Sequence, residues 1–535
     1  MALLQYVHLL YQHTLTLAAG STSTPSNKLK LLAALVALLT YKYRSHAIGT
    51  RRRDDLKEPK GAVPFFGHML LMASVPGTKL HDVHLKNYQE LGPVWSISLP
   101  GIGRMIQGDS PELIEHVVKT NFWAYGKGDH FSAVLGDIFG KGLICTDGDE
   151  WKHQRKEVSQ FFNVKLFREY ANEALNIETQ KVIDFLDKAA VSGTVINFHK
   201  LMYAFTLDSF GSLMLGESLG CLDNINGKAP FGEAITDLLQ IASDRLVDPI
   251  WKLREALTTV GAKSRHSKDV LRQHIQGIIA KHRAEEEKER EWGQGEEGKK
   301  KKTLLRMFMD VRDEDGKPHS DKHIVDITLN LMVAARDTSG DTLSWMLYFL
   351  LREEADPELL KTFVKEADEV LGDGPPPYET HKKQKFAEAC LLETLRFYPA
   401  LPRNLRFCNQ DDTLPDGTRI YAGEIFTWSS YTMGRSERIW GPDVLTFKPS
   451  RWFAGEKSAS LNKYNPFFLG PRACVGQGFA VLQAMTIMGL ILRKFEVALV
   501  EPGKLPKYGV GMTLPMVGGL PIRVSRRVRR EDVEA

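Results

Sequence analysis

A ten-residue run near the C-terminus constrains this 535-residue chain more than any other feature. The run 467–476, FFLGPRACVG, places Cys474 after a Gly-Pro turn, beside Arg472, and directly ahead of an apolar stretch that predicts a helix. A helix N-terminus offers unpaired N–H groups and a positive dipole, which keep a thiolate ionised. Gly470 and Gly476 let the backbone pass close to something large and flat. A haem iron held by a cysteine has these requirements, and the plainer alternative is a buried structural cysteine.

The same run resembles the haem-binding loop of the cytochrome P-450 monooxygenases, Phe-x-x-Gly-x-Arg-x-Cys-x-Gly, at every fixed position. The resemblance implies that Cys474 is the proximal ligand of haem b (iron protoporphyrin IX). It also implies that Gly476 belongs to the haem-binding loop and that Arg472 pairs with a haem propionate. The fold it implies is α+β and mainly α-helical, with small β-sheets around a buried haem.

Composition and patterning are compatible with that fold. The chain is 43% hydrophobic and 25% charged, which is ordinary for a large globular core. Helical patterns dominate 111–396, while strand and turn signals occur at 94–107 and 416–423. The charge-dense stretch 283–302 reads as a helix end that continues into a solvated loop. This order favours one α+β body over a doubly wound sheet.

Cysteine count and net charge exclude two other classes. The five cysteines are odd in number and lack metal-type spacing, which argues against a disulfide framework and for a reducing compartment. Lys plus Arg exceeds Asp plus Glu by 70 − 66 = 4, too small an excess to indicate a nucleic-acid partner.

The N-terminal region predicts a membrane anchor. Its cleanest apolar run, 31–41, would form about 16 Å of helix, and flanking basic residues extend the candidate transmembrane span to 29–43. A cleaved signal peptide is the alternative, because small residues at 17–20 suit a cleavage site, although the basic start is missing. We expect an anchor and basic linker over 1–50 and a catalytic domain over 51–535.

The orientation of that anchor follows from its charges. Arg44 and the arginines at 51–53 would keep the following domain on the cytosolic side of the endoplasmic reticulum membrane. The proline-punctuated segment 58–67 then predicts a stiff connection to the folded body, and it resembles the hinge of microsomal members of the family.

A second motif, Ala-Ala-Arg-Asp-Thr-Ser at 334–339, lies in an apolar helix pattern. An acid next to a hydroxyl costs stability there unless something requires it. The plain alternative is that Thr338 bonds back to a carbonyl one turn earlier while Asp337 points to solvent. The motif resembles the family's acid–alcohol pair, which implies that Asp337 and Thr338 deliver protons during catalysis. Ala335 stands where the family usually has glycine.

Two further motifs match the family in chain order. Glu393 and Arg396 lie three apart on one helix face and resemble the Glu-x-x-Arg signature, which Arg451 would complete as a buried structural ion network. Trp151 and Arg155, one turn apart, resemble the Trp-x-x-x-Arg pair that holds a haem propionate. The resemblance adds further residues, namely Arg406 as another propionate partner and Phe131, Ala334, Leu401 and Met512 as the substrate pocket.

Three function classes remain open at this point. They are a monooxygenase, a haem-thiolate isomerase or dehydratase, and a non-catalytic haem sensor. The acid–alcohol pair favours the monooxygenase, since rearrangement and sensing need no proton relay. The string at 431–443 resembles the plant and fungal clan that hydroxylates fatty acids and alkanes at or near the terminal carbon. A terpenoid, steroid or aromatic secondary metabolite is the alternative substrate.

The resemblance also implies redox partners. Electrons would come from NADPH through NADPH-cytochrome P-450 reductase, with cytochrome b5 as a second candidate donor. Lys152 and Lys156, together with Arg435 and Arg438, are candidates for docking an acidic flavoprotein. A simple solvated helix face explains the same charges equally well.

Overall fold

The structure is a computed structural model that describes residues 32, 35, 36, 38–163, 165–248, 250–292, 303–312, 316–372, 376–453, 461, 463, 464 and 466–528. The chain divides into two compact units. The first contains residues up to Gly126 together with Arg403–Thr432, and the second contains Lys127–Pro402 and the chain from Met433 onward. The predicted division at residue 50 is not one of these boundaries and stays a prediction.

The predicted anchor lies partly outside the described residues, which include 32, 35, 36 and 38–43 of the span 29–43. Within the part of the chain that the structure describes, no helix has the length and apolar character needed to cross a membrane.

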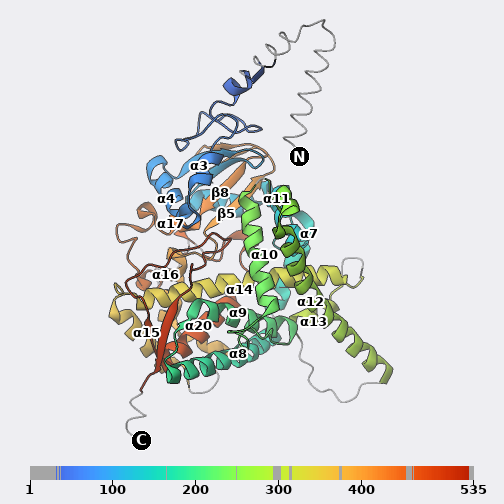
Figure 1. Cartoon of the computed structure of the whole chain (residues 1–535), viewed down its shortest axis with the longest axis vertical. Helices are drawn as coiled ribbons and strands as arrows, with labels where there is room; N and C mark the ends of the chain where they lie inside the picture. The colour runs from blue at the N-terminus through green and yellow to red at the C-terminus, as the bar shows by residue number, and fades with distance from the viewer. Residues whose placement is uncertain are drawn as a thin grey trace. The chain divides into compact units, whose positions relative to one another are not determined.

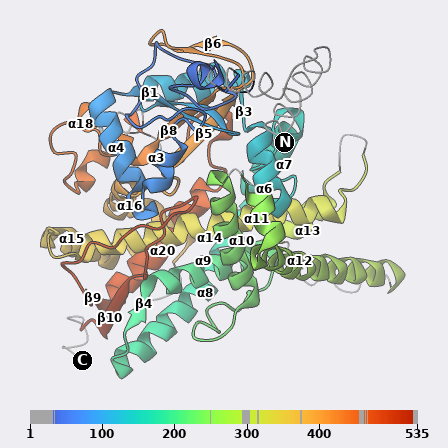
Figure 2. The same cartoon turned by 45° about the horizontal axis from the view of Figure 1, so that its top comes forward.

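The first unit is built on a five-stranded sheet with the order β1-β2-β8-β5-β3. Strands β1, β8, β5 and β3 are labelled in Figure 2. The hairpin predicted around 94–107 is confirmed, because β1 and β2 pair antiparallel with Val94 opposite Gly108. β8 pairs parallel to β2 and antiparallel to β5. The elements of this unit are β1 (Val94–Leu99), β2 (Gly103–Gly108), β3 (Tyr125–Gly126), β5 (Arg403–Cys408), β8 (Ile425–Ser429), the paired β6 (Asp412–Thr413) and β7 (Arg419–Ile420), and helices α3 (Met69–Ser74), α4 (Leu80–Leu91) and α5 (Pro111–Glu115).

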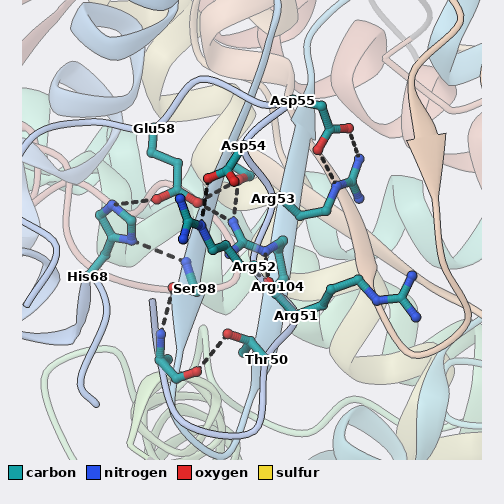
Figure 3. Close-up of polar contacts among 12 residues, drawn as sticks. Thr50, Arg51, Arg52, Arg53, Asp54, Asp55, Glu58, His68, Ser98 and Arg104 are labelled. Carbon is teal, nitrogen blue, oxygen red and sulfur yellow. Dashed lines mark hydrogen bonds and ion pairs between the residues drawn. The ribbon is translucent and has the colours of Figure 1, made fainter. Parts of the chain in front are cut away.

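Polar contacts fix the segment after residue 50 to the β1–β2 hairpin (Figure 3). Arg104 donates to the carbonyl of Arg51 at 3.1 and 2.9 Å and pairs with Glu58. Arg53 is buried and pairs with Glu424 at 2.7 Å. Arg53 is therefore a structural residue of the first unit, since a buried, paired guanidinium does not present its charge to a membrane surface.

The second unit is organised around α14 (Asp321–Leu351), which packs against α9 (Phe198–Leu215), α16 (Lys385–Phe397) and α20 (Gln477–Lys494) (Figure 1). The Ser320 hydroxyl caps α14 by accepting from the N–H of His323 at 3.3 Å. Gly340 permits close approach of α9, because a Cβ there would lie 2.4 Å from the Tyr203 ring. Most of α14 is buried, and the turn at 334–339 is its main opening to solvent.

The remaining elements confirm the mainly α-helical α+β class. The charge-dense stretch forms the end of α12 (Thr259–Trp292), and its later residues lie outside those described. A small sheet pairs β10 (Pro521–Arg526) with β4 (Ile196–Asn197) and β9 (Phe495–Leu499). The short helix α17 (Ser430–Met433) spans the boundary between the units at residues 432 and 433. The other helices are α6 (Gly128–Phe139), α7 (Gly148–Asn163), α8 (Lys165–Ser192), α10 (Pro230–Val247), α11 (Trp251–Leu257), α13 (Leu304–Asp310), α15 (Pro357–Val370) and α18 (Glu437–Trp440).

Candidate active site

The loop that carries Cys474 forms a closed turn. The N–H of Cys474 donates to the carbonyl of Phe467 at 2.8 Å. Within the turn, Phe468 has φ of 65° and Gly470 has φ of 72°. Glycine adopts this left-handed region without penalty, whereas Phe468 stores strain of about 1 kcal/mol or more. The surrounding loop holds that strain and places Cys474 two residues ahead of Gly476, the N-cap of α20.

Cys474 is the one exposed cysteine, whereas Cys145, Cys221, Cys390 and Cys408 are buried, and none of the five forms a disulfide. Enough protein still surrounds Cys474 for desolvation to raise its pKa above the ordinary value. The N–H groups of Gly476 and Gln477 and the charge of Arg155 act in the opposite direction and lower that pKa. An accessible thiol with donors directed at its sulfur is prepared to become a thiolate once a metal binds.

Three of the predicted propionate partners lie together beside this loop. The guanidinium of Arg472 stacks over the Trp151 ring, 4.2 Å from its centroid. Burial and, to a smaller extent, the like charge of Arg155 lower the pKa of Arg472 to about 10, although the Asp147 carboxylate acts to raise it. Two guanidiniums held close together in partly buried surroundings favour an added anion between them.

Asp147 is a partner of this group that the sequence reasoning missed. Its carboxylate forms an ion pair with Arg472, which also donates to the carbonyl of Thr146 at 3.0 Å. Asp147 also accepts from the N–H of Lys127 at 2.6 Å. Little in the sequence indicated this role for Asp147, because acidic residues are common at the start of a helix.

On α14, the side chain of Asp337 is only 14% exposed, so it does not point into solvent as the plain alternative had it. Burial raises the pKa of Asp337 from 3.8 to about 6. Arg336 lies 3.2 Å away, yet Asp337 Oδ1 has no hydrogen-bond partner within the described part of the chain. The Thr338 hydroxyl donates to the carbonyl of Ala334 at 2.6 Å, as the plain alternative had it. Its oxygen keeps acceptor capacity.

A second buried acid one turn further along α14 was also missed. Asp341 accepts from the Tyr203 hydroxyl at 2.7 Å and lies 2.7 Å from His199 Nε2. The guanidinium of Arg336 lies over the Tyr203 ring, 4.5 Å from its centroid. Asp337 therefore belongs to a polar cluster shared by α9 and α14. The four-residue spacing of Asp337 and Asp341 was the signal that would have found it.

Glu393, Arg396 and Arg451 form one buried ion cluster. Both Glu393 oxygens bond to Arg396 at 2.9 Å, and Arg451 Nε lies 3.5 Å from Glu393 Oε1. Glu393 also accepts from the Lys448 N–H at 2.8 Å and from the Trp452 indole at 2.9 Å. Neither Glu393 nor Arg396 is exposed. The geometry suits a structural role, since these partners saturate the carboxylate.

The remaining predicted residues are divided between the two units. Arg406 belongs to the first unit, on β5, where it donates to the carbonyl of Leu405 at 2.8 Å. Ala334 is exposed on α14, while Phe131, Leu401 and Met512 are partly exposed. Their grouping around one substrate stays a prediction, as does the propionate role of Arg406.

These residues fit a haem. The accessible cysteine sulfur receives backbone donors, and a guanidinium pair with a stacked indole suits a carboxylate. The central part of α14 is buried except at its acid–alcohol turn. A Cβ at Gly476 would lie 3.9 Å from the Cys474 sulfur, so glycine keeps that side of the sulfur uncovered. A haem with a cysteine axial ligand matches this donor set.

Comparison with known proteins agrees with this geometry. A sequence profile of the family described as Cytochrome P450 matches residues 57–516. The chain belongs to the cytochrome P450 family. It is 32% identical over 530 residues to Cytochrome P450 monooxygenase cyp1 of Mycosarcoma maydis, which covers 94% of this chain and 81% of that protein. It is 32% identical to Cytochrome P450 94B3 of Arabidopsis thaliana (82% and 86% covered) and 30% identical to Cytochrome P450 94A2 of Vicia sativa (79% and 82%).

As a cytochrome P450, the chain is an oxidoreductase of the monooxygenase class, and the family implies a haem iron. The resemblance to plant and fungal members is confirmed by relatives from both groups. The residue roles assigned above remain proposals.

Proposed function

We propose that this cytochrome P450 hydroxylates a fatty acid or alkane at or near its terminal carbon, with electrons from NADPH delivered by a reductase. The support for this substrate class is the resemblance of the string at 431–443 to the plant and fungal hydroxylase clan. Oxidation of a terpenoid, steroid or aromatic metabolite is the alternative, because pockets on one fold accept unrelated substrates.

The observation that carries the proposal is the accessible Cys474 sulfur ahead of α20, with Arg472 stacked on Trp151 beside it. In this arrangement Cys474 would bind the haem iron, while Arg472, Trp151 and Arg155 would hold a propionate. When bound, haem supplies the electron-rich iron centre that activates dioxygen.

Asp337 and Thr338 move protons in this proposal. With a pKa raised to about 6, Asp337 gains and releases a proton readily near neutral pH, as a relay acid must. The Thr338 oxygen accepts a hydrogen bond while its own proton is held by the carbonyl of Ala334. A haem-thiolate isomerase would need neither group, so this pair favours the monooxygenase.

The redox partner docks on the exposed side of α7, where Lys152 and Lys156 are both exposed. Arg435 is a weaker docking candidate than the two lysines, because it is only partly exposed. Its guanidinium donates to the carbonyl of Phe397 and lies over the Tyr398 ring, 5.0 Å from the centroid. These contacts keep the guanidinium of Arg435 packed on the protein surface. The double variant K152E/K156E should slow reduction in a salt-dependent way, whereas K188E/K281E changes the same net charge on α8 and α12 and should not.

The function is tested with purified protein, reductase and NADPH on medium- and long-chain fatty acids, alkanes and a terpenoid panel. We expect consumption of NADPH and dioxygen matched to terminal or near-terminal alcohol product. Conversion of a hydroperoxide without NADPH would contradict the monooxygenase reaction, and product from terpenoids alone would contradict the substrate class. Residence in the endoplasmic reticulum membrane is part of the proposal and is tested by fractionation of cells that express the full chain.

A further inference from the structure

Three potential metal ligands meet where α7 contacts the start of α14. Glu157 comes from α7, His319 directly precedes the Ser320 cap, and His323 lies in the first turn of α14. One ligand atom from each residue lies within 4.8 Å of those of the other two. His319 Nε2 is 3.2 Å from Glu157 Oε1, and the two imidazole rings stack with centroids 4.4 Å apart.

Two of these polar atoms are buried without a partner. His323 Nε2 and Glu157 Oε2 have no hydrogen bond within the described part of the chain. A buried polar group that is left unsatisfied costs about 1–3 kcal/mol, so native proteins rarely keep two side by side without a reason. A cation between the three residues would give both atoms a partner.

The donor set selects the kind of metal. Two imidazole nitrogens with one carboxylate oxygen suit Zn²⁺ and similar transition-metal dications, whereas Ca²⁺ and Mg²⁺ prefer sites built from oxygen alone. Zinc–ligand bonds of roughly 2.0–2.2 Å require the three donors to draw together slightly from their present separation. The positive end of the α14 dipole and the charge of Lys322 disfavour a cation at this position. The negative charges of Glu157 and Asp326 favour it.

We propose that Glu157, His319 and His323 form a binding site for Zn²⁺ that joins α7 to the N-terminus of α14. A fourth position is left for water, as in other sites with three protein ligands. The site is separate from Cys474 and does not depend on the substrate proposed above. Because Trp151 and Arg155 lie on the same helix as Glu157, a bound ion would also stabilise the helix that holds the proposed propionate partners.

The test uses the purified full-length holoprotein, stripped with a chelator and dialysed against increasing zinc chloride, with bound metal measured by mass spectrometry. We expect one zinc per chain, and a loss of affinity of 10-fold or more in E157Q and in H323Q. H266Q is the matched control, since His266 is exposed on α12 and outside the cluster, and it should bind zinc like the parent. Each variant is checked for folding by its ferrous carbon-monoxide spectrum.

Zinc K-edge absorption gives a second measurement that the haem iron does not obscure. We expect about three nitrogen or oxygen neighbours from protein at roughly 2.0–2.1 Å, two of them with the scattering pattern of imidazole. Equal zinc affinity in all three variants, absence of binding at millimolar zinc, or a spectrum without imidazole would overturn the proposal. The three residues would then form only a hydrogen bond between His319 and Glu157, with the His323 ring stacked on His319.

Discussion

Neutralising Glu393 should destabilise the second unit strongly, because this carboxylate is the common acceptor of its buried ion cluster. Glu393→Gln keeps the size of the side chain but removes the charge opposite Arg396, which is itself fully buried. Burial already lowers the pKa of Arg396 despite the adjacent carboxylate, so its charge is poorly solvated even in the parent. Removing one partner of a buried pair costs about 3–5 kcal/mol, since the other charge stays buried and uncompensated.

The assay is urea unfolding of the purified holoprotein, followed separately by tryptophan fluorescence and haem absorbance because a chain of this size need not unfold in one step. The control is Glu358→Gln, which removes an ion pair of 2.6 Å between Glu358 and Lys361 on the exposed side of α15. Exposed pairs are worth about 0–1 kcal/mol, so this control should move the midpoint little.

A double variant separates charge from packing. Glu393→Gln with Arg396→Gln removes both charges, and it should recover part of the loss because no charge is then buried alone. The reasoning would be refuted by a loss below about 1 kcal/mol in the single variant, or by a double variant that is as unstable as the sum of the two single changes.

Three further substitutions test the pKa of Asp337 and the packing of two helices. Because the raised pKa of Asp337 makes the folded chain bind its proton more tightly than the unfolded chain, stability should fall by roughly 3 kcal/mol as pH rises from about 4 to about 6. Asp337→Asn should lack that fall in urea unfolding, and parallel pH curves would contradict the assignment. Gly340→Ala should destabilise by about 1–3 kcal/mol, since the new methyl meets the Tyr203 ring. Gly136→Ala, in α6 with open space around it, should stabilise by about 0.5–1 kcal/mol, and equal signs for the two in thermal scans would refute this packing.

Much of the site could be predicted because its motifs are local. The members of the Cys474 loop, the Glu393–Arg396 pair and the Asp337–Thr338 turn lie close together in the sequence. Their spacing along the chain therefore largely determines their geometry. The β1–β2 hairpin was readable for the same reason, since a glycine-rich turn joins two short apolar runs.

Contacts between distant segments were not predictable. Asp147 and Arg472 lie 325 positions apart, and nothing in either local sequence indicates the other. The contact between Arg435 and the Phe397 carbonyl was equally hidden, because nothing in the local sequence of either residue indicates it. The division into two units was equally hidden, since residues 403–432 complete the sheet begun by β1 and β2.

The most direct test of the account is the ferrous carbon-monoxide spectrum of Cys474→Ser compared with the parent and with Cys145→Ser. Cys145 is buried and has its pKa raised to about 12 by desolvation, so its replacement should leave the spectrum unchanged. The account predicts the red-shifted Soret band of a thiolate-ligated haem in the parent and in Cys145→Ser, and its loss in Cys474→Ser. The same band in Cys474→Ser, or a parent protein that binds no haem, would contradict it.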